Sequence, residues 1–119
     1  MSADEGRLRI DDYLVHMLEA TRLARTYTDG LAKADFLADK RTQQAIILNL
    51  ITIGEVASRI CGNHKEFVAA HADIPWHQMR GMRNRMTHGY FDINLDVVWD
   101  TVQKSLPELE RQLTVLQAK

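Results

Sequence analysis

Residues 45–53 read AIILNLITI, and this stretch decides the fold class. Nearly every side chain in it is apolar, a pattern that suits either a buried strand or a buried helix. The run lies inside a longer segment, residues 40–61, which opens with Lys-Arg-Thr-Gln-Gln and is followed by Gly62. Strands are rarely that long, so the segment is predicted to be a helix that ends at Gly62.

This central helix is apolar on almost every side, apart from Asn49 and Glu55. A helix of this kind has to be covered on all of its sides. One small bundle offers few neighbours for that purpose. We therefore expect a second copy of the chain to cover one side of the helix, in a two-fold homodimer.

Helical spacing of apolar residues continues toward the N-terminus and in the segment that follows Gly62. Residues 8–28 are predicted to form a first helix, with Gly30 in a left-handed conformation just beyond its end. Short helices are expected at residues 34–39 and 64–71. The first helix has the core stripe Ile10, Leu14, Met17, Thr21 and Ala24.

Two prolines mark the helices of the second half of the chain. Pro75 is expected in the first turn of a helix, where proline is tolerated, and Gly89 is expected to end that helix. Asn94 is predicted to cap the last helix, which Pro107 should kink or split. No segment alternates cleanly between apolar and polar residues. The predicted fold is therefore an all-α bundle of four to five helices.

Length and composition exclude several classes of protein. The 119 residues suit a single domain, residues 1–119, and a hydrophobic share of 45% can build a core. No run of about 18 apolar residues occurs, so we expect no membrane-spanning helix. The first residues carry acids and no apolar segment, unlike a secretory signal. The single cysteine, Cys61, excludes an internal disulfide and a cysteine-based zinc site. We therefore expect a cytoplasmic protein.

Charge is nearly balanced overall but uneven along the sequence. A net charge of −1 argues against a protein that coats nucleic acid through bulk charge. Residues 74–91 nevertheless contain no acid, while they hold three arginines and two histidines. A local basic segment therefore lies on the helix that follows Pro75.

The centre of this basic segment is RNRMTHGY, residues 83–90. Asn84 and His88 are four residues apart, so they share one face of the predicted helix. Arg80 extends this row by one turn. Arg83 lies farther around the helix, but its long side chain can swing toward His88. Three methionines occupy the opposite, core-facing side. The polar face thus gathers guanidinium, amide and imidazole groups near the end of a helix.

These residue types suit a phosphodiester. Arg83 offers a planar fork of donors for phosphate oxygens and can stabilise the extra charge of a pentacoordinate transition state. His88 titrates near neutral pH, so it can take or give a proton. RNA supplies its own nucleophile, the 2′-hydroxyl, so cleavage needs no metal and no cofactor. The remaining histidines of this half show no recognised metal-ligand spacing: His64, His71 and His77.

Simpler interpretations stay open for each of these residues. A histidine near a helix C-terminus often interacts only with the helix dipole and the terminal carbonyls. Tyr90 could pack as an aromatic side chain after the helix end. Glu55 could be a buried carboxylate paired with an arginine, or it could orient the motif residues. Arg80 and Arg85 are either solvated or in contact with RNA.

The stretch PWHQMRGMRNRMTHGYFDI (75–93), followed by VVW (97–99), resembles the HepT-like (DUF86) branch of the HEPN superfamily. The signature of that branch is R-x4-H-x-Y, which corresponds here to Arg83, His88 and Tyr90. The flanking tryptophan and glycines make the match specific.

The resemblance covers most of the chain. It extends to Tyr13, to NLITIGEVASRI (49–60) and to the final helix, and Asn84 is the polar residue that commonly follows the arginine in HEPN nucleases. It implies a single HEPN helical bundle. It also implies a homodimer in which both motifs face one cleft.

The function that the resemblance implies is that of a toxin in a two-gene toxin–antitoxin system. Such a toxin is a metal-independent endoribonuclease, with Arg83 and His88 as catalytic residues and Asn84 in support. Its partner would be an MntA-type minimal nucleotidyltransferase antitoxin, which transfers AMP from ATP to the motif tyrosine, here Tyr90. The added phosphate would pair with Arg83, and the nucleoside would fill the RNA cleft.

Two other classes of function remain as alternatives. A non-catalytic helical binding module would dock a nucleotidyltransferase partner without cutting RNA. A purely structural dimer would tolerate changes in the motif without any effect on RNA or on a partner.

Overall fold

The structure, a computed structural model, describes residues 3–118, with side chains from residue 9 onward. It is an all-α bundle without strands in the described range, as predicted. The main helices are α1 (Ala3–Thr28), α3 (Lys40–Asn63), α5 (Trp76–His88) and α7 (Leu106–Ala118). The shorter elements are α2 (Lys33–Leu37), α4 (Lys65–Ala70), α6 (Leu95–Asp100), the 3-10 turn η1 (Tyr90–Asp92) and the π-helical turn η2 (Thr101–Ser105).

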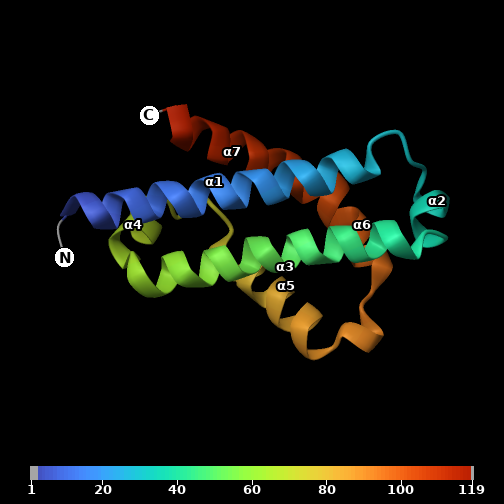
Figure 1. The fold of residues 1–119 in the computed structure, drawn as a ribbon. Helices are drawn as coiled ribbons and strands as arrows, with labels where there is room; N and C mark the ends of the chain where they lie inside the picture. Colours follow the sequence, from blue (N-terminus) through green and yellow to red (C-terminus); the bar gives the residue numbers. More distant parts are fainter. Residues whose placement is uncertain (1–2, 119) are drawn as a thin grey trace.

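The two longest helices, α1 and α3, lie antiparallel and side by side (Figure 1). The C-terminal helix α7 packs on the other side of α1, and α5 crosses α3 near its middle (Figure 1). The core lies between α1, α3 and the segment from α6 to α7. As a result, α5 rests mainly on α3 at the edge of the bundle.

The core stripe predicted for the first helix is confirmed except at Ile10, which is only partly buried. Leu14, Met17, Thr21 and Ala24 are all buried. The buried hydroxyl of Thr21 donates to the carbonyl of Met17 at 2.8 Å, so it leaves no polar group unsatisfied. Gly30 follows α1 with φ of +79°, the left-handed conformation that was expected there.

The central stretch forms the predicted helix, α3, but the predicted end is wrong. The helix continues through Gly62 to Asn63, because the N–H of His64 still donates to the carbonyl of Ile60 at 2.8 Å. The side that faces α1 is buried, whereas Leu48 on the open side is 63% exposed. One side of α3 thus lacks a cover among the residues that the structure describes.

By length and composition, α3 could also cross a membrane. The core helix of a folded domain satisfies the same criteria, and α3 packs between α1 and α5. The expectation that no segment of the chain spans a membrane therefore remains a prediction.

Asn94 caps α6 as predicted. Its Oδ1 accepts hydrogen bonds from the N–H groups of Asp96 at 3.0 Å and Val97 at 3.2 Å. Pro107 also acts as predicted: the helix changes to the π-helical turn η2 before it continues as α7. Without an N–H, Pro107 cannot extend the regular helical ladder.

Replacing Asn94 by alanine should lower the free energy of unfolding by about 1 kcal/mol, the usual cost of losing an N-cap side chain. Urea denaturation followed by circular dichroism measures this difference. The matched control is Ser105→Ala, an exposed polar side chain outside the cap, for which we expect a change below about 0.5 kcal/mol. Equal unfolding curves for both variants would contradict the cap.

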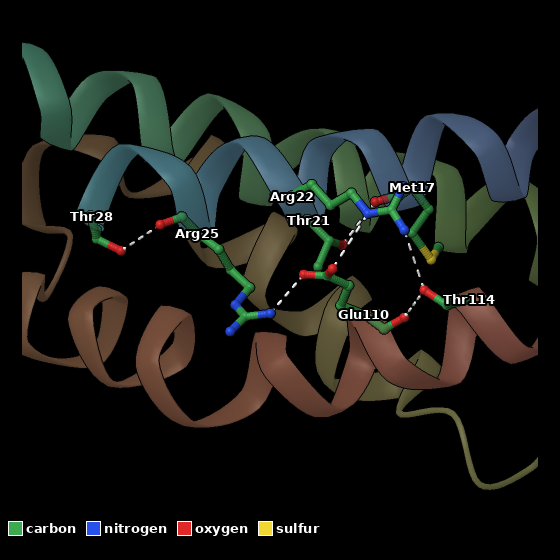
Figure 2. Close-up of polar contacts among 7 residues, drawn as sticks. All are labelled: Met17, Thr21, Arg22, Arg25, Thr28, Glu110 and Thr114. Atoms are coloured by element: carbon green, nitrogen blue, oxygen red, sulfur yellow. Dashed lines mark hydrogen bonds and ion pairs between the residues drawn. The ribbon is translucent and has the colours of Figure 1, made fainter. Parts of the chain in front are cut away.

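A polar clamp joins α1 to α7 (Figure 2). Glu110 accepts from Arg25 Nη1 at 2.7 Å and from Arg22 Nε at 3.3 Å. The hydrogen bond from Arg25 is the main cause that holds the pKa of Glu110 below its ordinary value. Arg22 also reaches Thr114 at 3.5 Å, so the clamp spans one further turn of α7.

Candidate active site

The motif helix α5 ends where the sequence predicted, but it begins one residue later than expected, because Pro75 lies before its first turn. Pro75 stands at its N-cap and Gly89 at its C-cap. Trp76, Met79 and Met86 are buried and fix the helix on the bundle.

The crossing of α5 and α3 depends on Gly54. A Cβ atom at this position would lie 2.6 Å from the carbonyl oxygen of Met79 and still closer to Cβ of Arg83. Only hydrogen fits there, so the backbones of the two helices approach closely. This crossing places Arg83 directly against α3.

Arg83 is bound by two side chains of α3. Its Nη1 donates to Oε1 of Glu55 at 2.8 Å, and its Nη2 donates to Oγ of Ser58 at 2.9 Å. The side chain of Arg83 is 23% exposed and that of Glu55 is 46% exposed. Glu55 therefore does pair with an arginine, but its carboxylate is not buried as that interpretation expected. The pair also sets the direction of the Arg83 guanidinium.

Ser58 was not predicted as a site residue. It lies three residues after Glu55, so both side chains share one face of α3. The three-residue spacing from Glu55 was the sequence feature that could have indicated Ser58. It indicates a site residue only when Arg83 is known to face α3.

Arg83 and His88 are not brought together within one chain. Five residues of α-helix separate them by about 7.5 Å along the axis and by about 140° around it. The guanidinium turns to α3 rather than toward His88, and no hydrogen bond joins the two residues. His88 and Asn84 are exposed, and Arg80, on the same row, is half-buried.

The prediction that polar and core-facing residues of this helix separate cleanly is thus wrong for Arg83. Its stem lies in the contact between α3 and α5, next to Met79. Its Nε is buried and has no acceptor among the described residues.

Tyr90 and Phe91 lie on the surface just after the motif helix. Tyr90 is 63% exposed and Phe91 is 84% exposed, with ring centroids 4.2 Å apart. The interpretation of Tyr90 as a packed aromatic is therefore not supported in this chain. Both rings line a groove of about 400 Å³ whose other wall is α3: Lys40, Gln43, Gln44, Ile47, Leu48 and Ile51, with Ile93 and Leu95.

Two other pockets are lined by neither Tyr90 nor Phe91. Arg85 lines one of about 480 Å³ between α5 and the segment that leads into α7. A pocket of about 540 Å³ beside the α1–α7 clamp contains no motif residue. Within the described residues, no three His, Cys, Asp or Glu side chains lie close enough together to hold a metal ion.

The site thus consists of a fixed guanidinium, an exposed imidazole and an exposed phenol on one helix and the turn after it. An all-α bundle with an R-x4-H-x-Y motif at such a place defines a protein of the HEPN class. Residues 17–116 match the family described as ribonuclease HepT-like, and the chain belongs to this family.

Similar proteins are found in archaea and bacteria. The chain is 38% identical over 99 residues to "Probable ribonuclease HepT" of Thermococcus cleftensis, and the matched region covers 83% of this chain and 87% of that protein. It is 34% identical over 101 residues to "Putative RNase TTE0752" of Caldanaerobacter subterraneus subsp. tengcongensis, with 85% and 88% covered. No solved structure matches the chain.

Proposed function

We propose that this protein is a metal-independent endoribonuclease, a toxin that acts on cellular RNA in the cytoplasm. The observation that carries the proposal is the position of the Arg83 guanidinium, which Glu55 and Ser58 of α3 hold in place. Arg83 lies on α5, the helix that also bears the exposed His88. The family match and the names of the relatives support the same activity.

The proposed reaction is a transesterification within the RNA strand. The 2′-oxygen bonds to phosphorus as its proton passes to a general base, and the bond from phosphorus to the 5′-oxygen breaks as a general acid protonates that oxygen. His88 supplies proton transfer, and Arg83 stabilises the added negative charge on the phosphate oxygens. The product end is a 2′,3′-cyclic phosphate.

The separation of Arg83 from His88 favours a site composed of two chains. In a two-fold dimer whose two motifs face one cleft, two composite sites can form, each with its guanidinium from one copy and its imidazole from the other. The uncovered side of α3 is the surface proposed for this contact. Leu48 and Phe91 are its exposed hydrophobic residues, and they lie beside the motif.

Replacing Leu48 by glutamate should convert the dimer into monomers, because it places a charge in an apolar contact. Light scattering coupled to gel filtration is expected to show at least about a tenfold rise in the dissociation constant, a change of about 1.4 kcal/mol. Val115→Glu on α7 is the control, since Val115 is similarly apolar and 45% exposed but lies away from α3. A Leu48→Glu protein that stays dimeric would remove this surface from the proposal.

Tyr90 is the proposed target of the antitoxin. Its exposed phenol can enter the active site of an MntA-type nucleotidyltransferase without unfolding of the bundle. An AMP ester would add a phosphate near the cationic motif and a nucleoside next to the groove beside α3. These two groups would block the entry of RNA.

The proposal is tested by incubating RNA and DNA of one sequence with the protein in EDTA. We expect RNA to be cut to cyclic phosphate ends and DNA to stay intact. Intact mass after co-expression with the nucleotidyltransferase should show AMP additions on Tyr90, together with loss of cleavage. Partner binding without any cleavage by the unmodified protein would instead establish the binding module.

A further inference from the structure

A second basic cluster lies beyond Glu55 and Ser58 on α3 and has no role in the proposed reaction. Arg59 is the residue of α3 that acts on the phenol of Tyr13 on α1 and helps to lower its pKa. Arg9 Nη2 donates to the Tyr13 hydroxyl at 3.0 Å, and its guanidinium carbon lies 5.9 Å from the ring centre. Arg9 thus binds the phenol directly, and Arg59 is the second guanidinium that acts on it.

The charge of this cluster is not neutralised by carboxylates of residues 9–118. Arg22, Arg25, Arg83 and Arg111 all form ion pairs in that range, whereas Arg9 and Arg59 form none there. The hydrogen bond from Arg9 lowers the pKa of the Tyr13 phenol, and Arg59 acts in the same direction. Both side chains are exposed, so their guanidinium groups are open to solvent.

The cluster is continuous with the site around Arg83. Arg59 directly follows Ser58 and lies one helical turn after Glu55, on the same face of α3. Glu55 is the acid of that face, and its carboxylate is already bound to Arg83. Arg83 on α5, Arg59 on α3 and Arg9 on α1 thus belong to three helices of which α3 packs against the other two.

We propose that Arg59, Tyr13 and Arg9 form a phosphate subsite that binds the backbone of the substrate RNA next to the phosphate held by Arg83. The subsite rests on the proposed function and specifies where the strand runs. Contacts to phosphates position the strand without reading its bases.

Fluorescence anisotropy with a 2′-O-methyl oligoribonucleotide tests the subsite, because this strand has no free 2′-hydroxyl and is not cut. We expect Arg59→Ala to weaken binding about tenfold at low salt and to reduce the slope of log affinity against log salt by about 0.7. Arg59→Lys should keep most of the slope, since it keeps the charge. Arg59 is exposed, so the fold should tolerate both changes.

Arg111→Ala is the matched control, because it removes the same charge from an exposed position on α7. Equal affinity and slope for Arg59→Ala and the wild type would overturn the subsite, and so would an equal loss with Arg111→Ala. A change of dimer mass in Arg59→Ala with unchanged RNA binding would assign the cluster to a protein contact instead. Failure of the wild type to cut RNA would overturn the proposed function alone, since the binding comparison needs no cleavage.

Discussion

Replacing Arg83 by alanine is expected to lower the rate constant of RNA cleavage about a thousandfold, the cost of removing a preorganised donor to a charged transition state. The fold should survive, because Glu55 is 46% exposed and water can solvate its carboxylate once the guanidinium is gone. Arg83→Lys should recover little activity. Lysine keeps the charge but cannot bind Glu55, Ser58 and a phosphate through one planar group.

Complementation makes this prediction sharper. We expect His88→Ala to lose activity as Arg83→Ala does, while a mixture of the two, exchanged into mixed dimers, regains about a quarter of the wild-type rate. Random exchange makes half of the dimers mixed, and each mixed dimer keeps one of two composite sites. A mixture that stays inactive would show that Arg83 and His88 act within one chain. Full cleavage by folded His88→Ala dimers would refute the catalytic assignment.

The helices of this protein could be predicted from periodicity because their apolar faces meet the core at regular spacing. Asn94 and Pro107 were also predictable, since a cap and a missing N–H act within one turn. The end of α3 was not, because Gly62 permits a left-handed conformation without requiring it. Local rules describe what a residue can do, and the packing decides between the options.

The candidate site shows the limit of sequence spacing more clearly. Arg83, His88 and Tyr90 were found from their chemistry and order in the chain. The binding of Arg83 by Glu55 and Ser58 depends on how α5 crosses α3, which no helical period describes. A glycine in the middle of α3, which costs about 1 kcal/mol relative to alanine, was the one local sign of that crossing.

Replacing Gly54 by alanine is accordingly expected to damage both the fold and the site. The new methyl group would stand 2.6 Å from the Met79 carbonyl and nearer still to Arg83, so α5 has to move away from α3. Overpacking of this kind should lower the free energy of unfolding by about 1–3 kcal/mol. Cleavage should fall about a hundredfold in the fraction that stays folded, because a shift of about 1 Å in a positioned group has that effect.

Gly62→Ala separates this effect from helix propensity. Gly62 lies in the same helix, and a Cβ there would meet nothing within 4 Å, so alanine should stabilise the protein by about 0.5–1 kcal/mol and leave cleavage unchanged. Urea denaturation and cleavage assays on both variants measure the contrast. If Gly54→Ala gained stability as Gly62→Ala does, α5 would not press on α3 at this point, and the binding of Arg83 by Glu55 and Ser58 would need another cause. If Gly54→Ala lowers the free energy of unfolding and Gly62→Ala raises it, the position of the Arg83 guanidinium depends on the close approach of the α3 and α5 backbones.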